Sequence, residues 1–293
     1  MNLRSLYPYL LMFLLLGITQ SCQNKDAEAP TTSFYYWKTN FSLSTVEREA
    51  LQNNDINKLY VRYFDVALKD NKPFPISALQ FKEKPPVKTL VPVVYIKNEV
   101  MLASTLDVKL LAQQMLHYID QINTAHNIQI QEIQLDCDWT LKSRDAFFSL
   151  LRALKEERPL SYSCTIRLHQ IKYPDKTGIP PVDYGVLMYY NMGEISSNSI
   201  NSIYDRKIAQ RYISSLTSYP LPLNIALPIF SWAVHIRQGK TINLITRLTE
   251  VQLAAAPESF APHQKGQYLV LQNGLFFGRL FAKDDILKIE EIK

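Results

Sequence analysis

Two aspartates, Asp136 and Asp138, are the residues whose type and spacing most directly suggest chemistry. They belong to residues 131–140, QEIQLDCDWT, where polar and apolar residues alternate as in a buried strand, so both carboxylates share one face. At the roughly 7 Å that separates such positions, two charges in a medium of dielectric about 20 repel by about 2.4 kcal/mol. Their pKa values should then differ by about 1.7. We interpret the pair as catalytic carboxylates, one holding a proton while the other stays ionised.

The next predicted strand, residues 160–168, offers partners for this pair. Alternation places Arg167 and His169 on the face that also carries Ser and Thr side chains, and consecutive strands of a barrel are neighbours. We expect Arg167 to be the counter-ion of Asp136, which leaves Asp138, nearer the mouth, as the group that titrates. The alternative is a structural Asp–Arg network that orders the interior without chemistry.

Aromatic and charged residues recur at the ends of nearly all the predicted strands. Sugar C–H faces pack on aromatic rings while hydroxyls need charged or amide partners, so this makeup fits a carbohydrate ligand. The predicted ligand-binding residues are Trp37, Arg62, Tyr95, Trp139, Arg167, His169, Tyr190, Asn191 and Trp232. Ordinary packing or hydrogen bonding at a strand end is the structural alternative for these positions. A second carboxylate could come from Asp65, Glu99 or Glu194.

The composition argues against other classes of site. The five histidines are dispersed, which gives no metal-ligand pattern, and the eight glycines form no phosphate-binding loop. We therefore expect no metal and no cofactor. The formal charge is +5, but no basic run is interleaved with aromatic residues, so a nucleic-acid partner is not expected either. The partners that remain are a carbohydrate ligand and a membrane, and the chain is expected to be a monomer.

Short strands that alternate with amphipathic helices predict an α/β protein with a (β/α)₈ TIM-type barrel. The predicted strands are residues 33–37, 58–66, 89–96, 132–138, 160–168, 184–190 and 224–229. Residues 268–277 hold an Asn273-Gly274 pair that predicts a hairpin, and residues 286–292 read as a short helix. The eighth barrel unit is therefore expected to be atypical or incomplete and to end in this C-terminal hairpin. A doubly wound sheet is the second choice.

Helical stripes mark the segments between these strands. Ser44 and Glu47 form a capping-box pattern, and Ser143 is a predicted cap before the apolar stripe of residues 147–154. Further stripes run along residues 111–122 and 208–216.

The N-terminus has the pattern of an exported protein. Arg4 precedes an apolar run, and small residues lead to Cys22, so residues 1–21 are predicted to be a lipoprotein signal peptide with Cys22 as the lipidated residue. Residues 22–32 are polar and read as a flexible tether, followed by one barrel domain over residues 33–293. This predicts lipid anchoring in the cell envelope, at the outer membrane. A plain signal peptide or a short membrane anchor is the alternative.

These motifs together resemble the chitinase-like family-18 glycosidases and related glycosidase-like barrel lipoproteins of Bacteroidetes. The family's fourth strand reads Asp-x-x-Asp-x-Asp-x-Glu, and Asp136 and Asp138 occupy its second and third acidic positions. Ile133 stands at the first position, and Thr140 stands where the family places its proton-donating Glu. Residues 188–191, MYYN, are similar to the family's Met-x-Tyr-Asp, and residues 225–232 resemble a late barrel strand.

The resemblance implies a barrel that acts on or binds a polysaccharide. In the family the substrate's own N-acetyl group attacks. This chemistry requires carboxylates at two positions that hold Thr140 and Asn191 in this chain. Two hypotheses follow: a glycoside hydrolase with Asp138 as general acid tuned by Asp136, or a catalytically inactive glycan-binding or assembly lipoprotein.

Overall fold

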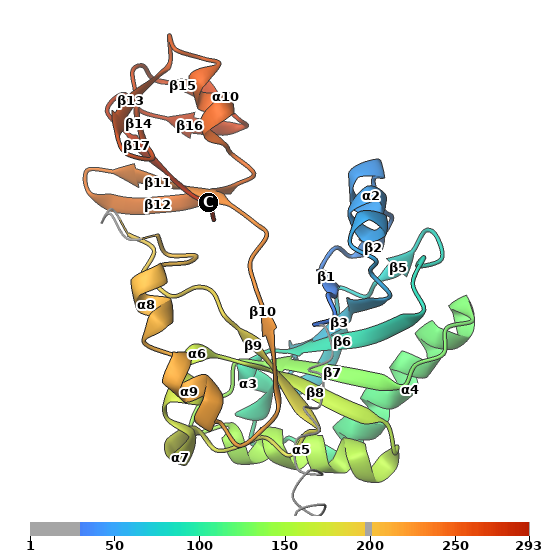
Figure 1. Ribbon diagram of the computed structural model, residues 1–293. Helices are drawn as coiled ribbons and strands as arrows, with labels where there is room; N and C mark the ends of the chain where they lie inside the picture. Colours follow the sequence, from blue (N-terminus) through green and yellow to red (C-terminus); the bar gives the residue numbers. More distant parts are fainter. Residues whose placement is uncertain (1–29, 197–200, 293) are drawn as a thin grey trace, which may run out of the picture.

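The computed structural model describes residues 30–196 and 201–292. Its largest element is a curved parallel sheet in which strands that follow one another in the chain are also neighbours in space (Figure 1). The parallel strands, in spatial order, are β1 (Phe34–Tyr36), β3 (Lys58–Lys69), β6 (Thr89–Ile96), β7 (Glu132–Cys137), β8 (Ser161–Ile166), β9 (Tyr184–Met188) and β10 (Leu223–Ala226). This confirms the predicted α/β barrel-type fold, because each predicted strand corresponds to one of the seven.

The barrel is open between β1 and β10. Within the described ranges these two strands pair only with β3 and with β9, and no strand bridges them. The prediction of an incomplete eighth unit is therefore confirmed. On β3, the end of the strand extends into an antiparallel pair with β4 (Lys72–Ile76), and β2 (Asn40–Phe41) pairs with β5 (Gln80–Phe81).

Helices connect the strands of the parallel sheet along the chain. They are α2 (Thr45–Asn53), α3 (Asn98–Met101), α4 (Val108–His126), α5 (Arg144–Glu157), α6 (Leu168–Lys172), α7 (Pro174–Thr177), α8 (Arg206–Gln210) and α9 (Ile213–Ser218). The apolar stripes of α4 and α5 are buried against the strands, as their spacing predicts. Outward-facing Cys137 and Cys164 are buried free thiols in this layer.

The helix boundaries agree with the sequence in most places. Ser44 and Glu47 form the predicted capping box of α2. Ser143 stands at the N-cap of α5, but its hydroxyl accepts a hydrogen bond from Thr140 N at 2.9 Å rather than from the helix. The single stripe predicted over residues 208–216 is divided between α8 and α9.

The chain after β10 forms a second sheet with its own core. Its antiparallel strands, in spatial order, are β12 (Lys240–Thr246), β11 (Trp232–Arg237), β17 (Ile286–Glu290), β14 (Gln267–Val270) and β13 (Phe260–Gln264). A hairpin of β15 (Gly274–Phe276) and β16 (Arg279–Phe281) and the helix α10 (Glu250–Ala254) complete it. Phe260, Leu253 and Leu287 are buried in a cluster separate from the core of the parallel sheet.

Two predictions for this region are wrong. Residues 286–290 are the central strand β17 rather than a helix, because Leu287 and Ile289 pack into the second core at the period of two that a strand requires. The hairpin turn lies at Phe277-Gly278, where both residues have positive φ, and not at Asn273-Gly274. Asn273 instead accepts a hydrogen bond from Lys283 N through its side chain.

The predicted membrane features concern mainly the start of the chain. The signal peptide, Cys22 and all but residues 30–32 of the tether lie outside the described residues. In the part of the chain that the structure covers, every helix is too short or too polar to cross a membrane.

Candidate functional site

A row of polar side chains crosses the lumen near the carboxyl ends of the strands. Asp65, Tyr95 and Asp136 are in register across β3, β6 and β7. On the next strand, the Thr165 hydroxyl donates a hydrogen bond of 2.6 Å to Asp136 Oδ1. Asp136 therefore faces the lumen from a buried position, as the alternation of β7 predicts.

Arg167 bridges the two predicted catalytic carboxylates. It lies just after β8, at the N-terminus of α6, where its Nη2 is 3.2 Å from Asp136 Oδ1 and its Nε donates to Asp138 Oδ1. Asp136 is buried, whereas the Asp138 side chain is 55% exposed. Burial raises the pKa of Asp136, although Arg167 and the Thr165 hydrogen bond oppose this shift. The pKa of the inner carboxylate is therefore set by burial acting against its arginine and hydroxyl partners.

The third carboxylate of this region is paired in the same way. Asp65 accepts hydrogen bonds from Nε of Arg62 at 2.6 Å and from its Nη2, which is a bidentate pair. The Arg62 guanidinium also lies 5.9 Å from the centre of the Trp37 ring. Both arginines of the predicted site are therefore bound to aspartates.

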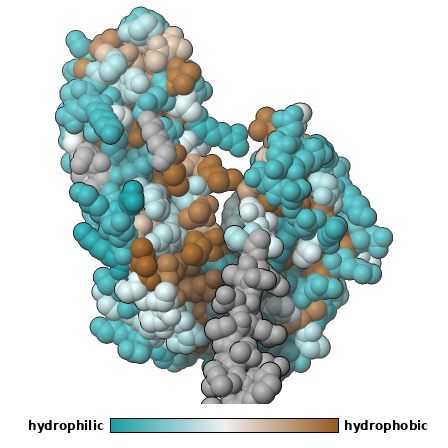
Figure 2. Space-filling view, viewed as in Figure 1, coloured by the Kyte–Doolittle hydropathy of each residue, from teal (hydrophilic) through white to brown (hydrophobic). Residues whose placement is uncertain are grey.

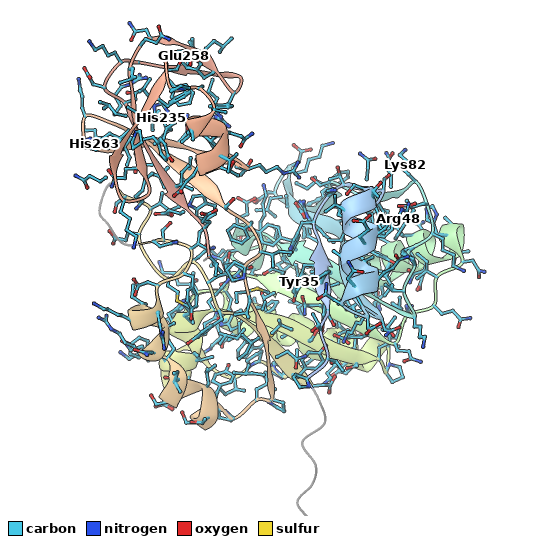
Figure 3. All side chains as sticks on the ribbon, turned by 45° about the horizontal axis from the view of Figure 1, so that its top comes forward. Tyr35, Arg48, Lys82, His235, Glu258 and His263 are labelled. Carbon is cyan, nitrogen blue, oxygen red and sulfur yellow. The ribbon has the colours of Figure 1, made fainter. Side chains whose placement is uncertain are left out.

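One aromatic row descends into the lumen along the β1 edge. Trp37 stacks on Tyr35 at 5.9 Å and 9°, and Tyr35 stacks on Tyr60 at 4.8 Å and 23°. Tyr35, which Figure 3 labels, donates its hydroxyl hydrogen to Gln134 Oε1 at 2.8 Å. Trp37, 39% exposed, is the outermost ring of the row. The sequence analysis missed Tyr35, although its position two residues before Trp37 places both on one strand face.

A second aromatic row stands at the other edge of the open sheet. Tyr190, just after β9, meets Phe230 edge-on at 5.6 Å and 86°. Phe230 in turn contacts Trp232 at 5.2 Å. Figure 2 shows a hollow between the two lobes of the molecule, with hydrophobic residues gathered along its left wall.

The floor of the lumen is a hydrogen-bonded network that sequence analysis missed. Glu132 accepts from Lys58 Nζ at 2.7 Å, from Ser163 Oγ at 2.8 Å and from the Tyr184 hydroxyl. The Tyr60 and Tyr184 hydroxyls are 2.7 Å apart. The alternation of β7 puts Glu132 on the same face as Asp136, so its position in the lumen could have been predicted from the sequence.

The remaining predicted residues differ in how they relate to this lumen. Tyr95 is half-buried beside the aspartates, and burial followed by the charge of Asp138 raises its pKa. His169 lies on α6 and is exposed at the surface. Partial desolvation of its ring and the charge of Arg167 lower its pKa, while Asp138 opposes that shift. Asn191 is exposed, has a left-handed backbone with φ 54°, and donates its backbone N–H to Ile203 O.

Trp139 is not part of the lumen. Its side chain is buried, stacks on Phe147 of α5 at 5.2 Å, and donates its indole N–H to Thr177 O at 3.3 Å. The prediction that it contacts ligand is wrong for a physical reason: its odd-numbered position continues the outward face of Cys137.

The loop glutamates stand outside the arginine-bound cluster. Glu99 is 4.0 Å from Lys97, and Glu194 is exposed after β9. The described residues contain no group of three or more His, Cys, Asp and Glu side chains placed to hold a metal ion. A cavity of about 1020 Å³ lies at the opposite end of the strands, between the start of β6 and the end of α4, and contains none of the predicted residues.

Comparisons with known proteins bear on the fold. No protein-family model matches the sequence, and no curated protein matches it significantly. The structure is similar to a chitinase-like agglutinin from Robinia pseudoacacia, with a TM-score of 0.50 and 12% identity over 89% of this chain and 87% of that chain. It is also similar to a plant class V chitinase mutant from Cycas revoluta in complex with (GlcNAc)3, with a TM-score of 0.50 and 11% identity over 89% and 88% of the two chains. The structural neighbours are thus chitinase-like (β/α)₈ barrels of low sequence identity.

Proposed function

We propose that this protein binds glycans through a glycosidase-like barrel and does not hydrolyse them. The observation that carries the proposal is the bridge of Arg167 between Asp136 and Asp138. A general acid must hold and release a proton, whereas an arginine partner stabilises the ionised carboxylate. Asp65 is held by Arg62 in the same manner, and Thr140 stands where the related glycosidases place their proton donor.

The ligand class proposed is an oligosaccharide that contains N-acetylglucosamine. The two aromatic rows offer flat apolar faces, and the polar lumen row offers hydroxyl partners, which together suit a pyranose. The names of the structural neighbours support this class, since one is an agglutinin and the other was solved with (GlcNAc)3. This support is an analogy between folds, so it sets the first ligand to try rather than the specificity.

One observation favours hydrolysis as a second candidate function. Burial raises the pKa of Asp136, which is the direction that a general acid needs, and Thr165 holds its carboxyl in place. In that case Asp136 rather than Asp138 would donate the proton. Arg167 would then have to move away from the Asp136 carboxylate when the ligand enters.

The experiment separates binding from turnover. The domain without residues 1–21 is titrated calorimetrically with (GlcNAc)3 and longer oligomers, while reducing-end release is followed over days. We expect binding without product, and binding that weakens in Trp37→Ala, whose ring is exposed at the mouth. Product release that disappears in Asp136→Asn would establish the hydrolase instead. Absence of binding to every oligomer would remove the carbohydrate proposal.

We also propose that the protein is a cell-envelope lipoprotein of the outer membrane, anchored through Cys22, on the strength of the N-terminal sequence pattern. Cys22→Ala should move the protein from the membrane fraction to the soluble fraction, with Cys137→Ala as the control that leaves the anchor in place. Membrane association that survives Cys22→Ala would refute lipid anchoring.

A further inference from the structure

We infer that Phe230 is a ligand-contacting ring of the lumen and that Glu290, in the C-terminal sheet, is the residue that positions it. This inference rests on the proposed glycan binding and adds two residues that the sequence did not suggest. The second sheet would then act on the ligand indirectly, through the connector of residues 227–231 that joins β10 to β11.

The placement of Phe230 between two rings fits a ligand contact. Tyr190 meets it edge-on at 5.6 Å, and Trp232 lies against it at 5.2 Å, so neighbours on both sides restrict its orientation. The ring remains 39% exposed, the same fraction as Trp37 on the opposite edge of the open sheet. Exposure of an aromatic ring whose orientation is already fixed provides the apolar platform that a sugar face can use.

Glu290 fixes the other end of this aromatic row. It faces Trp232 in register across β11 and β17, and its Oε2 accepts the indole N–H at 2.8 Å. Ser202 Oγ donates to the same oxygen, and Lys288 Nζ lies 2.6 Å from Oε1. The glutamate is only 1% exposed. Its hydrogen bonds are therefore shielded from water, which strengthens them and fixes the orientation of the Trp232 ring.

The same contacts join the second sheet to the parallel sheet. Ser202 belongs to the segment that follows β9, and Asn201 Nδ2 from that segment donates to Glu291 O at 2.9 Å. Its neighbour Ile203 accepts the backbone N–H of Asn191, directly after Tyr190. Glu290 is thus connected to the lumen by two routes, one through Trp232 and Phe230 and the other through Ser202 and residue 191.

A double-mutant cycle on Trp232 and Phe230 tests the coupling. Trp232→Phe keeps a ring beside Phe230 but removes the N–H that Glu290 accepts. We expect (GlcNAc)3 affinity to fall about fivefold to tenfold in Phe230→Ala and about twofold to fivefold in Trp232→Phe. The double variant should bind no more weakly than Phe230→Ala alone, because Trp232 acts through Phe230.

Two further variants separate positioning from general stability. Glu290→Gln keeps an oxygen for the indole and should retain more affinity than Glu290→Ala. Leu253→Ala is the matched control, because it opens the core of the same sheet without touching the aromatic row, and it should lower the unfolding midpoint while leaving affinity unchanged. Additive losses in the cycle, or wild-type affinity in Phe230→Ala, would overturn the inference.

A readout without ligand distinguishes this inference from the proposed function. If the wild type binds neither (GlcNAc)3 nor any longer oligomer, glycan binding fails and the ligand role of Phe230 fails with it. Amide hydrogen exchange of residues 227 and 229–231 still decides the positioning role of Glu290. Exchange should be faster in Trp232→Phe than in Leu253→Ala; equal rates would refute it.

Discussion

Lys58 and Glu132 form an ion pair of 2.7 Å at the floor of the lumen, and the lysine also lies over the Tyr60 ring at 4.8 Å. The pair closes the amino-terminal end of the barrel with polar contacts where many barrels use apolar layers. Glu132 also accepts from Ser163 and Tyr184, so the carboxylate connects its own strand β7 with β3, β8 and β9.

Removal of the Glu132 carboxylate should therefore destabilise the protein. We expect Glu132→Leu to lower the free energy of unfolding by about 2 kcal/mol, less than the roughly 3–5 kcal/mol of a fully buried pair, because the Lys58 side chain is 29% exposed. Urea denaturation measures the loss. The double variant Lys58→Met/Glu132→Leu should recover part of this loss, because it removes both charges of the pair. A double variant with a lower free energy of unfolding than either Lys58→Met or Glu132→Leu alone would contradict the explanation.

Asp136 should make the protein less stable as pH rises. Because burial raises its pKa in the folded state, its stabilising effect is present below the unfolded value of 3.8 and is lost as pH rises through the folded value. Asp136→Asn lacks this titration. Between pH 3.5 and pH 7 the urea midpoint of the wild type should therefore fall progressively relative to that of Asp136→Asn. A difference between the two midpoints that stays constant with pH would show that the pKa of Asp136 is not raised.

Asp285 should have the opposite dependence. Burial opposes its ionisation, but hydrogen bonds from Arg237, Ala282 N and His235 lower its pKa to about 2, from 3.8. A lowered pKa contributes stability above the unfolded value that is lost as pH falls through the folded value. Asp285→Asn should cost about 2 kcal/mol at pH 7 and progressively less toward pH 2. His263→Gln, on an exposed position of the same sheet, is the control.

Two tryptophans should separate stability from binding. Trp139→Ala should destabilise the protein by about 3–5 kcal/mol, because its ring fills the core beside α5. Trp37→Ala should change stability little, since its ring is 39% exposed, and should weaken (GlcNAc)3 binding about tenfold. Thermal melts measure the loss of stability, and calorimetric titrations measure the loss of affinity. A binding defect in Trp139→Ala but not in Trp37→Ala would show that Trp139, and not Trp37, contacts the ligand.

The parts of the fold that local patterns determine could be predicted from sequence. Alternation placed Asp136 and Arg167 in the lumen, and helical periodicity located α4 and α5. Where the prediction for Trp139 departed from alternation, it failed. Glu290 could not be found, because its role depends on pairing between β11 and β17, which are separated by dozens of residues and leave no local signal.

The open edge at β10 has a consequence for how copies of this chain meet. An unpaired strand usually offers a row of N–H and C=O groups to which another chain can add. Here the strand has four residues, and Pro222 and Pro228, which have no N–H to donate, stand on either side of it. The exposed ladder is therefore short and interrupted at both ends, so the sheet can remain unclosed without serving as a template for stacking.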